Sequence, residues 1–181
     1  MIVEEKTLES ERIYEGKILN LRRDKVAAKN GTSYREIVEH SGGIVVIGLT
    51  DEGRVPMVRQ YRKAAEKAVL EIPAGKLEKG EIPSRAAARE FKEETGYSAG
   101  DIKYLMEGYS SIGYSTEILR FYLAENLTPG ETDFDDNEAI IVEEYTPDEL
   151  YRMAMDGELI DQKTIVAALL AHELAKGAGD S

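Results

Sequence analysis

Three glutamates are grouped within residues 83–95: Glu90, Glu93 and Glu94. This segment begins with proline and is followed by glycine, which predicts a helix, because proline favours the first helical position and glycine follows helix ends. Residues three and four apart share one flank of a helix, so the three carboxylates project together. Like charges this close repel each other unless a cation neutralises them, and Mg²⁺ or Mn²⁺ prefers oxygen ligands. The group could therefore hold divalent metal for chemistry on phosphates.

An arginine directly precedes this group. Arg89 is placed to pair with Glu93 four residues later or to reach back to Glu81, which would orient a ligand carboxylate. Considered only as charge, the glutamates also fit an ordinary solvated helix face, the usual role of surface charge runs. The residues around them decide between the two interpretations.

The glutamates belong to a longer pattern of fixed residue types. It consists of Gly, five residues, Glu, seven residues, Arg-Glu, an apolar residue, any residue, Glu-Glu, any residue, Gly and an apolar residue. Every fixed position is filled: Gly75, Glu81, Arg89, Glu90, Phe91, Glu93, Glu94, Gly96 and Tyr97. From residue frequencies, a chance match somewhere in the chain is well below roughly one in 10⁴. The segment resembles the Nudix box, the signature of hydrolases that cleave a nucleoside diphosphate linked to another moiety.

The resemblance covers most of the chain. Segments similar to those of bacterial ADP-ribose pyrophosphatases occur in order at residues 35–38, 58–62, 70–76, 121–125 and 135–138. The resemblance implies an α/β (α+β) fold, a Nudix α/β/α sandwich around a mixed β-sheet with a small β-rich N-terminal subdomain. We place the subdomain in residues 1–40 and the Nudix domain in residues 41–181. In the family, the subdomain is exchanged between the subunits of a homodimer.

The resemblance also implies a metal site and a base. By position, the metal ligands are Glu90, Glu94, the backbone carbonyl of Ala74 and Glu138. Glu93 would be a further metal or water-orienting carboxylate. The position of the catalytic base is occupied by Asp136, which is shorter than the glutamate of the best-studied branch. Asp136 and Glu93 therefore both remain candidates for the base.

Substrate recognition is expected to involve arginines, because a guanidinium can hold phosphate through two hydrogen bonds. The candidates are Arg35, Arg59 and Arg62, with ordinary surface charge as the alternative for each. One departure concerns the substrate: where ADP-ribose members carry Ser-Pro-Gly, this chain has isoleucine at position 112. Proline restricts the backbone, so Ile112 could reshape the pocket, including Glu117, which the resemblance places at the ribose.

Other parts of the sequence predict the elements that position these residues. Alternating stretches around Lys29-Asn30-Gly31 predict antiparallel hairpins within residues 11–40. Strands are predicted at residues 44–49, 55–61, 102–109, 118–123 and 139–144, and the chain is expected to turn at residues 73–75. Besides residues 83–95, helices are predicted at residues 146–155, from a capping box, and after Asp161. The arc expected to attach the first helix to the sheet is Ala87, Ala88, Phe91 and Thr95.

Composition restricts the class of protein. The chain has 181 residues, no cysteine and a formal net charge of −12. The absence of cysteine excludes disulfides, a thiol nucleophile and cysteine-bound zinc, and favours the reducing cytoplasm. The acidic balance argues against nucleic acid and anionic membranes as partners, and no apolar run reaches the about 18 to 20 residues of a membrane span. The sequence also lacks a phosphate-binding loop motif.

We therefore expect a cytoplasmic homodimeric pyrophosphatase that uses Mg²⁺, or Mn²⁺, to hydrolyse ADP-ribose to AMP and ribose 5-phosphate. Another nucleoside diphosphate sugar is the alternative substrate, because of Ile112. A Nudix-like sensor that binds ADP-ribose without hydrolysing it is a second alternative. Such sensors commonly lose acids from the box, whereas this chain retains all four box glutamates.

Overall fold

The structure, a computed structural model, describes residues 2–78, 80–134 and 139–179. Two of the expected site residues, Asp136 and Glu138, lie outside the described residues. The chain divides into two units, one of Met1–Gly42 with Gly108–Ile118 and one of Gly43–Glu107 with Leu119–Ser181. Each unit has its own sheet structure and is described separately.

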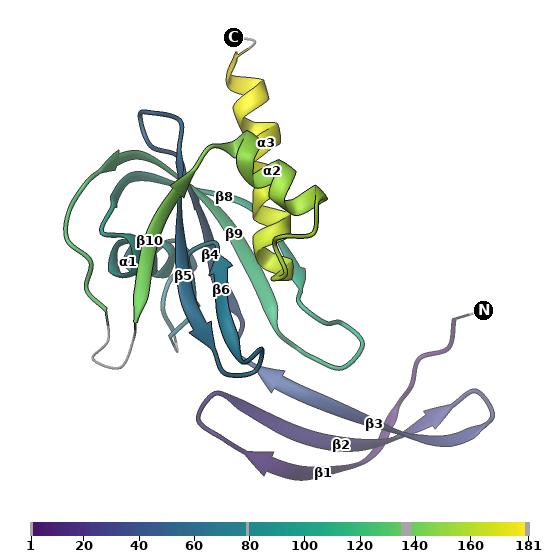
Figure 1. The fold of residues 1–181 in the computed structure, drawn as a ribbon. Helices are drawn as coiled ribbons and strands as arrows, with labels where there is room; N and C mark the ends of the chain where they lie inside the picture. Colours follow the sequence, from purple (N-terminus) through teal and green to yellow (C-terminus); the bar gives the residue numbers. More distant parts are fainter. Residues whose placement is uncertain (1, 79, 135–138, 180–181) are drawn as a thin grey trace. The chain divides into compact units, whose positions relative to one another are not determined.

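The first unit contains a three-stranded antiparallel sheet in the order β1-β2-β3 (Figure 1). Its strands are β1 (Thr7–Glu15), β2 (Leu19–Ala28) and β3 (Gly31–His40). The turn between β2 and β3 ends at Gly31, whose φ of 117° lies in a region that side chains disfavour. The predicted hairpin around Lys29-Asn30-Gly31 is thus confirmed, and β1 extends the sheet to Thr7.

The second unit contains two sheets (Figure 1). The first, in the order β7-β4-β9-β8, consists of β4 (Gly43–Gly48), β7 (Ala74–Lys76), β8 (Ser98–Tyr109) and β9 (Ile118–Thr128). The second, in the order β10-β5-β6, consists of β5 (Val55–Arg62), β6 (Lys67–Glu71) and β10 (Ile140–Tyr145). Since β4 runs parallel to β9 and antiparallel to β7, the predicted mixed sheet is confirmed.

Three helices are described: α1 (Pro83–Thr95), α2 (Pro147–Met155) and α3 (Gln162–Gly179). The α1 helix begins with proline and ends at Gly96, whose φ of 79° allows the left-handed cap. The α2 helix has the predicted capping box: the Thr146 hydroxyl accepts a hydrogen bond from the backbone N–H of Glu149, and the Glu149 carboxylate accepts one from the backbone N–H of Thr146. No helix in the described part of the chain is long and apolar enough to cross a membrane.

Strand β4 separates the two hydrophobic clusters of the second unit. Its alternate residues Ile44 and Val46 pack with α1, whereas Val45 and Ile47 pack with α2 and α3. Figure 1 accordingly shows α1 and the α2–α3 pair on opposite sides of the strands. The predicted layered α/β arrangement is therefore confirmed.

The buried face of α1 differs from the expected one at one position. Ala87, Phe91 and Thr95 are buried as expected, but the fourth buried residue is Ala86, and Ala88 is only partly buried. Ala86 lies four residues before Glu90 and so shares its side of the helix. The α1 helix therefore also turns its acidic flank toward the protein, where β7 packs on it.

Gly48, at the end of β4, tests the packing of this helix. A Cβ atom at position 48 would lie 2.3 Å from Cζ of Phe91, a fully buried side chain. Overpacking of this kind costs about 1–3 kcal/mol, so we expect Gly48→Ala to lower the free energy of unfolding by that amount. Urea denaturation measures the change. Gly108→Ala is the control because nothing lies within 4 Å of a Cβ there; equal stability of the two variants would contradict this packing.

Candidate active site

Strand β7 and helix α1 bring three predicted metal ligands to one place. The backbone N–H of Ala74 donates a hydrogen bond to Oε2 of Glu94 at 3.0 Å. A Cβ atom on Gly75 would lie 1.9 Å from Cδ of Glu90, so the Glu90 carboxyl occupies the space that a side chain at position 75 would fill. Both glutamates therefore meet consecutive residues of the same short strand.

Arg89 joins the carboxylates of the α1 flank. Its guanidinium donates to Glu81 at 3.0 and 3.1 Å, to Glu90 at 2.9 Å and to Glu93 at 3.0 Å. Both pairings expected from the sequence, with Glu81 and with Glu93, are thus present. Burial and the charge of Glu93 raise the pKa of Glu90 above its ordinary value, and the hydrogen bond from Arg89 opposes them only in part. Positive charge close to Glu90, such as that of Arg89, thus favours the ionised form of its carboxyl group.

The donor set fits a hard divalent cation. The predicted ligands offer only oxygen atoms, which Mg²⁺ and Mn²⁺ prefer, and the bare backbone of Gly75 makes room for the Glu90 carboxyl beside Ala74. Within residues 2–78, 80–134 and 139–179, no group of three or more acidic or histidine side chains is arranged so that it could hold a metal ion. The fourth predicted ligand, Glu138, is not among these residues.

The two candidate arginines of β5 lie on opposite faces of their sheet. Residues three apart in a strand alternate in direction, and each arginine has its own carboxylate partner. Arg62 donates through Nε and Nη2 to Glu71 at 2.5 and 2.7 Å, whereas Arg59 donates to Glu143 at 2.5 and 3.1 Å. The hydrogen bond with Glu71 raises the pKa of Arg62 against the effect of burial, and the charge of Glu94 contributes to the rise. Arg62 therefore lies within electrostatic range of Glu94 on α1.

Arg59 lies away from that flank. It lines a cavity of about 220 Å³ together with residues of β6, of α2 and of the segment that follows α2, including Leu70, Met153 and Leu159. Leu70 and Met153 belong to the hydrophobic cluster of α2 and α3. The structure thus brings Arg62, but not Arg59, to the side of the sheet that Glu94 occupies.

Two predicted substrate residues, Arg35 and Glu117, belong to the first unit. Arg35 donates to Glu5 at 2.5 and 2.9 Å, and Glu117 lies 3.2 Å from Nδ1 of His40. Phosphate binding by Arg35 would therefore compete with its pairing to Glu5. Ile112, at the position of the family's proline, is 77% exposed, so no packing of its side chain replaces the restriction that proline imposes.

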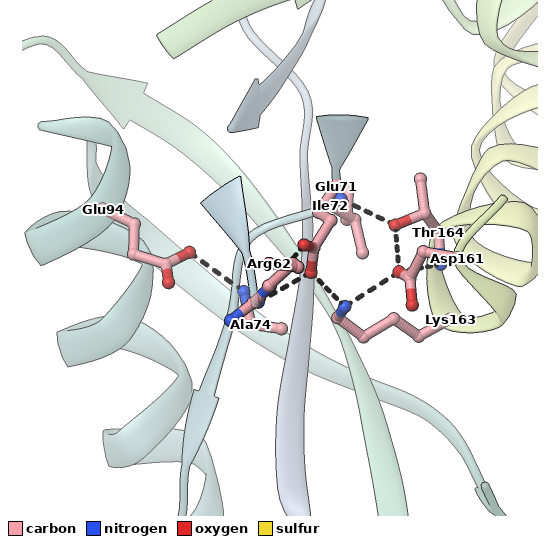
Figure 2. A network of polar contacts seen from close by, with 8 residues as sticks. All are labelled: Arg62, Glu71, Ile72, Ala74, Glu94, Asp161, Lys163 and Thr164. Carbon is pink, nitrogen blue, oxygen red and sulfur yellow. Dashed lines mark hydrogen bonds and ion pairs between the residues drawn. The ribbon is translucent and has the colours of Figure 1, made fainter. Parts of the chain in front are cut away.

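The sequence did not identify a polar network behind Ala74 (Figure 2). Glu71 accepts hydrogen bonds from Arg62 and, at 2.5 Å, from Nζ of Lys163, which also donates to Asp161 at 2.8 Å. Thr164, which is fully buried, donates to Asp161 at 2.5 Å and accepts from the backbone N–H of Ile72 at 2.9 Å. The sequence predicts only that a helix follows Asp161, and it contains no local signal that Lys163 meets Glu71.

Comparison with known proteins gave consistent results. Residues 39–168 match the NUDIX domain, and residues 5–36 match the nucleoside diphosphate sugar hydrolase N-terminal domain. An ADP-ribose pyrophosphatase of Bacillus subtilis is 42% identical over 168 residues, 91% of each chain. A methanol dehydrogenase activator of Bacillus methanolicus is 42% identical over 169 residues, 92% of this chain and 91% of that protein. The crystal structure of an ADP compounds hydrolase has the same fold, with a TM-score of 0.87, 20% identity and coverage of 100% and 99% of the two chains.

Proposed function

Because the chain belongs to the NUDIX domain family, we propose that it hydrolyses the diphosphate of ADP-ribose to AMP and ribose 5-phosphate, with Mg²⁺ as its metal. The observation that carries this proposal is the meeting of Glu90 and Glu94 with Gly75 and Ala74. The similarity to the ADP-ribose pyrophosphatase of Bacillus subtilis, which spans 91% of each chain, supports the choice of substrate. Mn²⁺ is the alternative metal.

The metal would be held by carboxylate and carbonyl oxygens. Its proposed ligands are Glu90, Glu94, the carbonyl of Ala74 and Glu138. A bound divalent cation would neutralise charge that develops on the diphosphate and lower the pKa of a bound water. Arg89 holds Glu90 and Glu93 in place through hydrogen bonds of 2.9 and 3.0 Å. These contacts support its assignment as a residue that orients the carboxylates.

Proton removal and phosphate binding fall to other side chains. Glu93 or Asp136 accepts the proton of the attacking water. Arg62 binds a phosphate oxygen through the part of its guanidinium that does not face Glu71. Arg35, Arg59 and Glu117 remain proposed contacts to the rest of the substrate.

We further propose a cytoplasmic homodimer with a small-molecule substrate. Residues 1–40 would form the subdomain exchanged between subunits, and residues 41–181 the Nudix domain. The exposure of β1 along all nine residues supports a partner for this strand. The net charge of −12 supports neither nucleic acid nor an anionic membrane as a binding partner.

A substrate panel tests the proposed function. Purified protein with Mg²⁺ is assayed for phosphate-coupled turnover of ADP-ribose, ADP-glucose, UDP-glucose, GDP-mannose, NADH and diadenosine polyphosphates. We expect ADP-ribose to give the highest kcat/KM. Another leading substrate would retain the metal chemistry and refute the assigned pocket, and Ile112 would then be the first residue to examine. Absence of turnover with every compound would favour the sensor.

A further inference from the structure

We propose that Glu71 is a positioning residue for this reaction: anchored by Lys163, it fixes the Arg62 guanidinium so that the opposite edge receives a phosphate of the substrate. The proposal rests on the function proposed above. The residues that carry it are drawn in Figure 2, where Arg62 lies between the side chains of Glu71 and Glu94.

The Glu71 carboxylate is buried and has a second cationic partner besides Arg62. Its side chain is 3% exposed, and both oxygens accept hydrogen bonds from Arg62 while Oε2 also accepts one from Lys163. Burial alone raises the pKa of Glu71, but the contacts with Arg62 and Lys163 outweigh burial, and the pKa lies below its ordinary value. The Glu71 carboxylate thus stays charged. The positive charge of Lys163 is balanced by Asp161 as well. A buried ionic arrangement of this kind adds little net stability, which favours a role in fixing geometry.

The Arg62 side chain is suited to such fixation. A free arginine side chain carries substantial rotamer entropy, which ligand binding must otherwise remove. The pair with Glu71 engages Nε and Nη2, so the guanidinium plane is set before a ligand arrives, and Nη1 takes no part in the pair. With 45% of its side chain exposed, Arg62 remains accessible to a phosphate. Without Glu71, the attraction of Arg62 to Glu94 would draw the guanidinium toward a proposed metal ligand.

The same network fixes the backbone that leads to Ala74. The N–H of Ile72 donates to Thr164 at 2.9 Å, the carbonyl of Pro73 accepts from Val46 at 2.9 Å, and the N–H of Ala74 donates to Glu94 at 3.0 Å. Three consecutive residues after Glu71 are therefore each held by a different element. The first turn of α3 thus helps to position both Arg62, through Glu71, and the strand that carries a proposed metal ligand, through Ile72.

A double-mutant cycle tests the proposal. KM and kcat for ADP-ribose are measured for wild type, Glu71→Gln, Arg62→Gln and the double variant. We expect Glu71→Gln to raise KM about tenfold, a change of about 1.4 kcal/mol, with a smaller effect on kcat. In the Arg62→Gln background, the same change should alter KM less than about twofold, because Glu71 acts through Arg62. Equal fold-changes in both backgrounds would refute the proposal and indicate a purely structural role.

One further measurement and a control variant separate the positioning role of Glu71 from the proposed function on which it rests. Binding of the nonhydrolysable analogue α,β-methylene ADP-ribose is measured by calorimetry, and Kd should rise with Glu71→Gln as KM does. Analogue binding that Glu71→Gln leaves unchanged would refute the positioning role alone; a wild-type protein that neither binds the analogue nor hydrolyses ADP-ribose would refute the function and the positioning role together. Glu125→Gln, which removes the partner of Lys103 on β8, is the control and should leave KM unchanged.

A second variant tests the proposal if the first one does not fold. If thermal unfolding shows that Glu71→Gln does not fold, Lys163→Gln replaces it in the cycle. This variant leaves the pair between Arg62 and Glu71 in place but removes the anchor on α3. We expect a rise in KM of about threefold that disappears in the Arg62→Gln background. An unchanged KM would refute the role of Lys163 as the anchor.

Discussion

Glu94→Gln is expected to lower kcat for ADP-ribose hydrolysis by about 100-fold or more while the protein remains folded. Glutamine keeps an oxygen that can accept the 3.0 Å hydrogen bond from the N–H of Ala74, so the contact between α1 and β7 is retained. The substitution removes the negative charge with which Glu94 would bind the metal. Steady-state kinetics at saturating Mg²⁺ and thermal unfolding together measure both effects.

Glu173→Gln is the matched control for this substitution. Glu173 is a helical glutamate paired with Lys176 on the surface of α3, and its replacement should leave kcat unchanged. A Glu94→Gln enzyme with normal kcat at saturating Mg²⁺ would refute the assignment of Glu94 as a metal ligand. Loss of activity accompanied by loss of folding would instead assign Glu94 to the stability of β7.

Gly75→Ala is expected to reduce kcat/KM by about 100-fold and to raise the Mg²⁺ concentration needed for half-maximal activity. The new Cβ would lie 1.9 Å from Cδ of Glu90 and 2.0 Å from its Oε2, so the carboxyl must leave its place beside β7. Gly75 is not among the residues with positive φ, so alanine fits the backbone itself. The effect should therefore come from Glu90 and not from strain. A magnesium titration of activity measures it.

Gly108→Ala is the control for this change as well, because a Cβ at position 108 meets nothing within 4 Å. It should retain the activity and the magnesium dependence of the wild type. If Gly75→Ala behaves in the same way, the Glu90 carboxyl is not needed where the structure places it, and the proposed site at β7 is wrong.

The local part of the site could be predicted from sequence. The proline and glycine that bound α1 predict the helix, and the four-residue spacing predicts that Arg89 can reach Glu93, with Glu81 as the other expected partner. The structure has the helix at Pro83–Thr95 and both pairings. Each of these features depends on residues less than about four helical turns apart, which is the range over which sequence patterns act directly.

The parts that depend on distant contacts could not be predicted. Residues 73–75 look like a turn, yet Ala74–Lys76 forms β7 because it pairs with β4, about thirty residues earlier in the chain. The contact of Lys163 with Glu71 spans 92 residues and depends on how α3 packs on the sheet. The opposite directions of Arg59 and Arg62, in contrast, follow from strand alternation, because β5 extends one residue beyond the predicted range 55–61 and includes Arg62.

The most direct test of the central claim is product analysis of ADP-ribose incubated with the purified protein and Mg²⁺. Chromatography should recover AMP and ribose 5-phosphate in equal amounts, and excess EDTA should abolish their formation, because the proposed ligands on α1 and at Ala74 would act through a bound divalent metal. Intact ADP-ribose after prolonged incubation with Mg²⁺ or Mn²⁺, or equal cleavage in the presence of EDTA, would contradict a metal-dependent diphosphate hydrolase at this site.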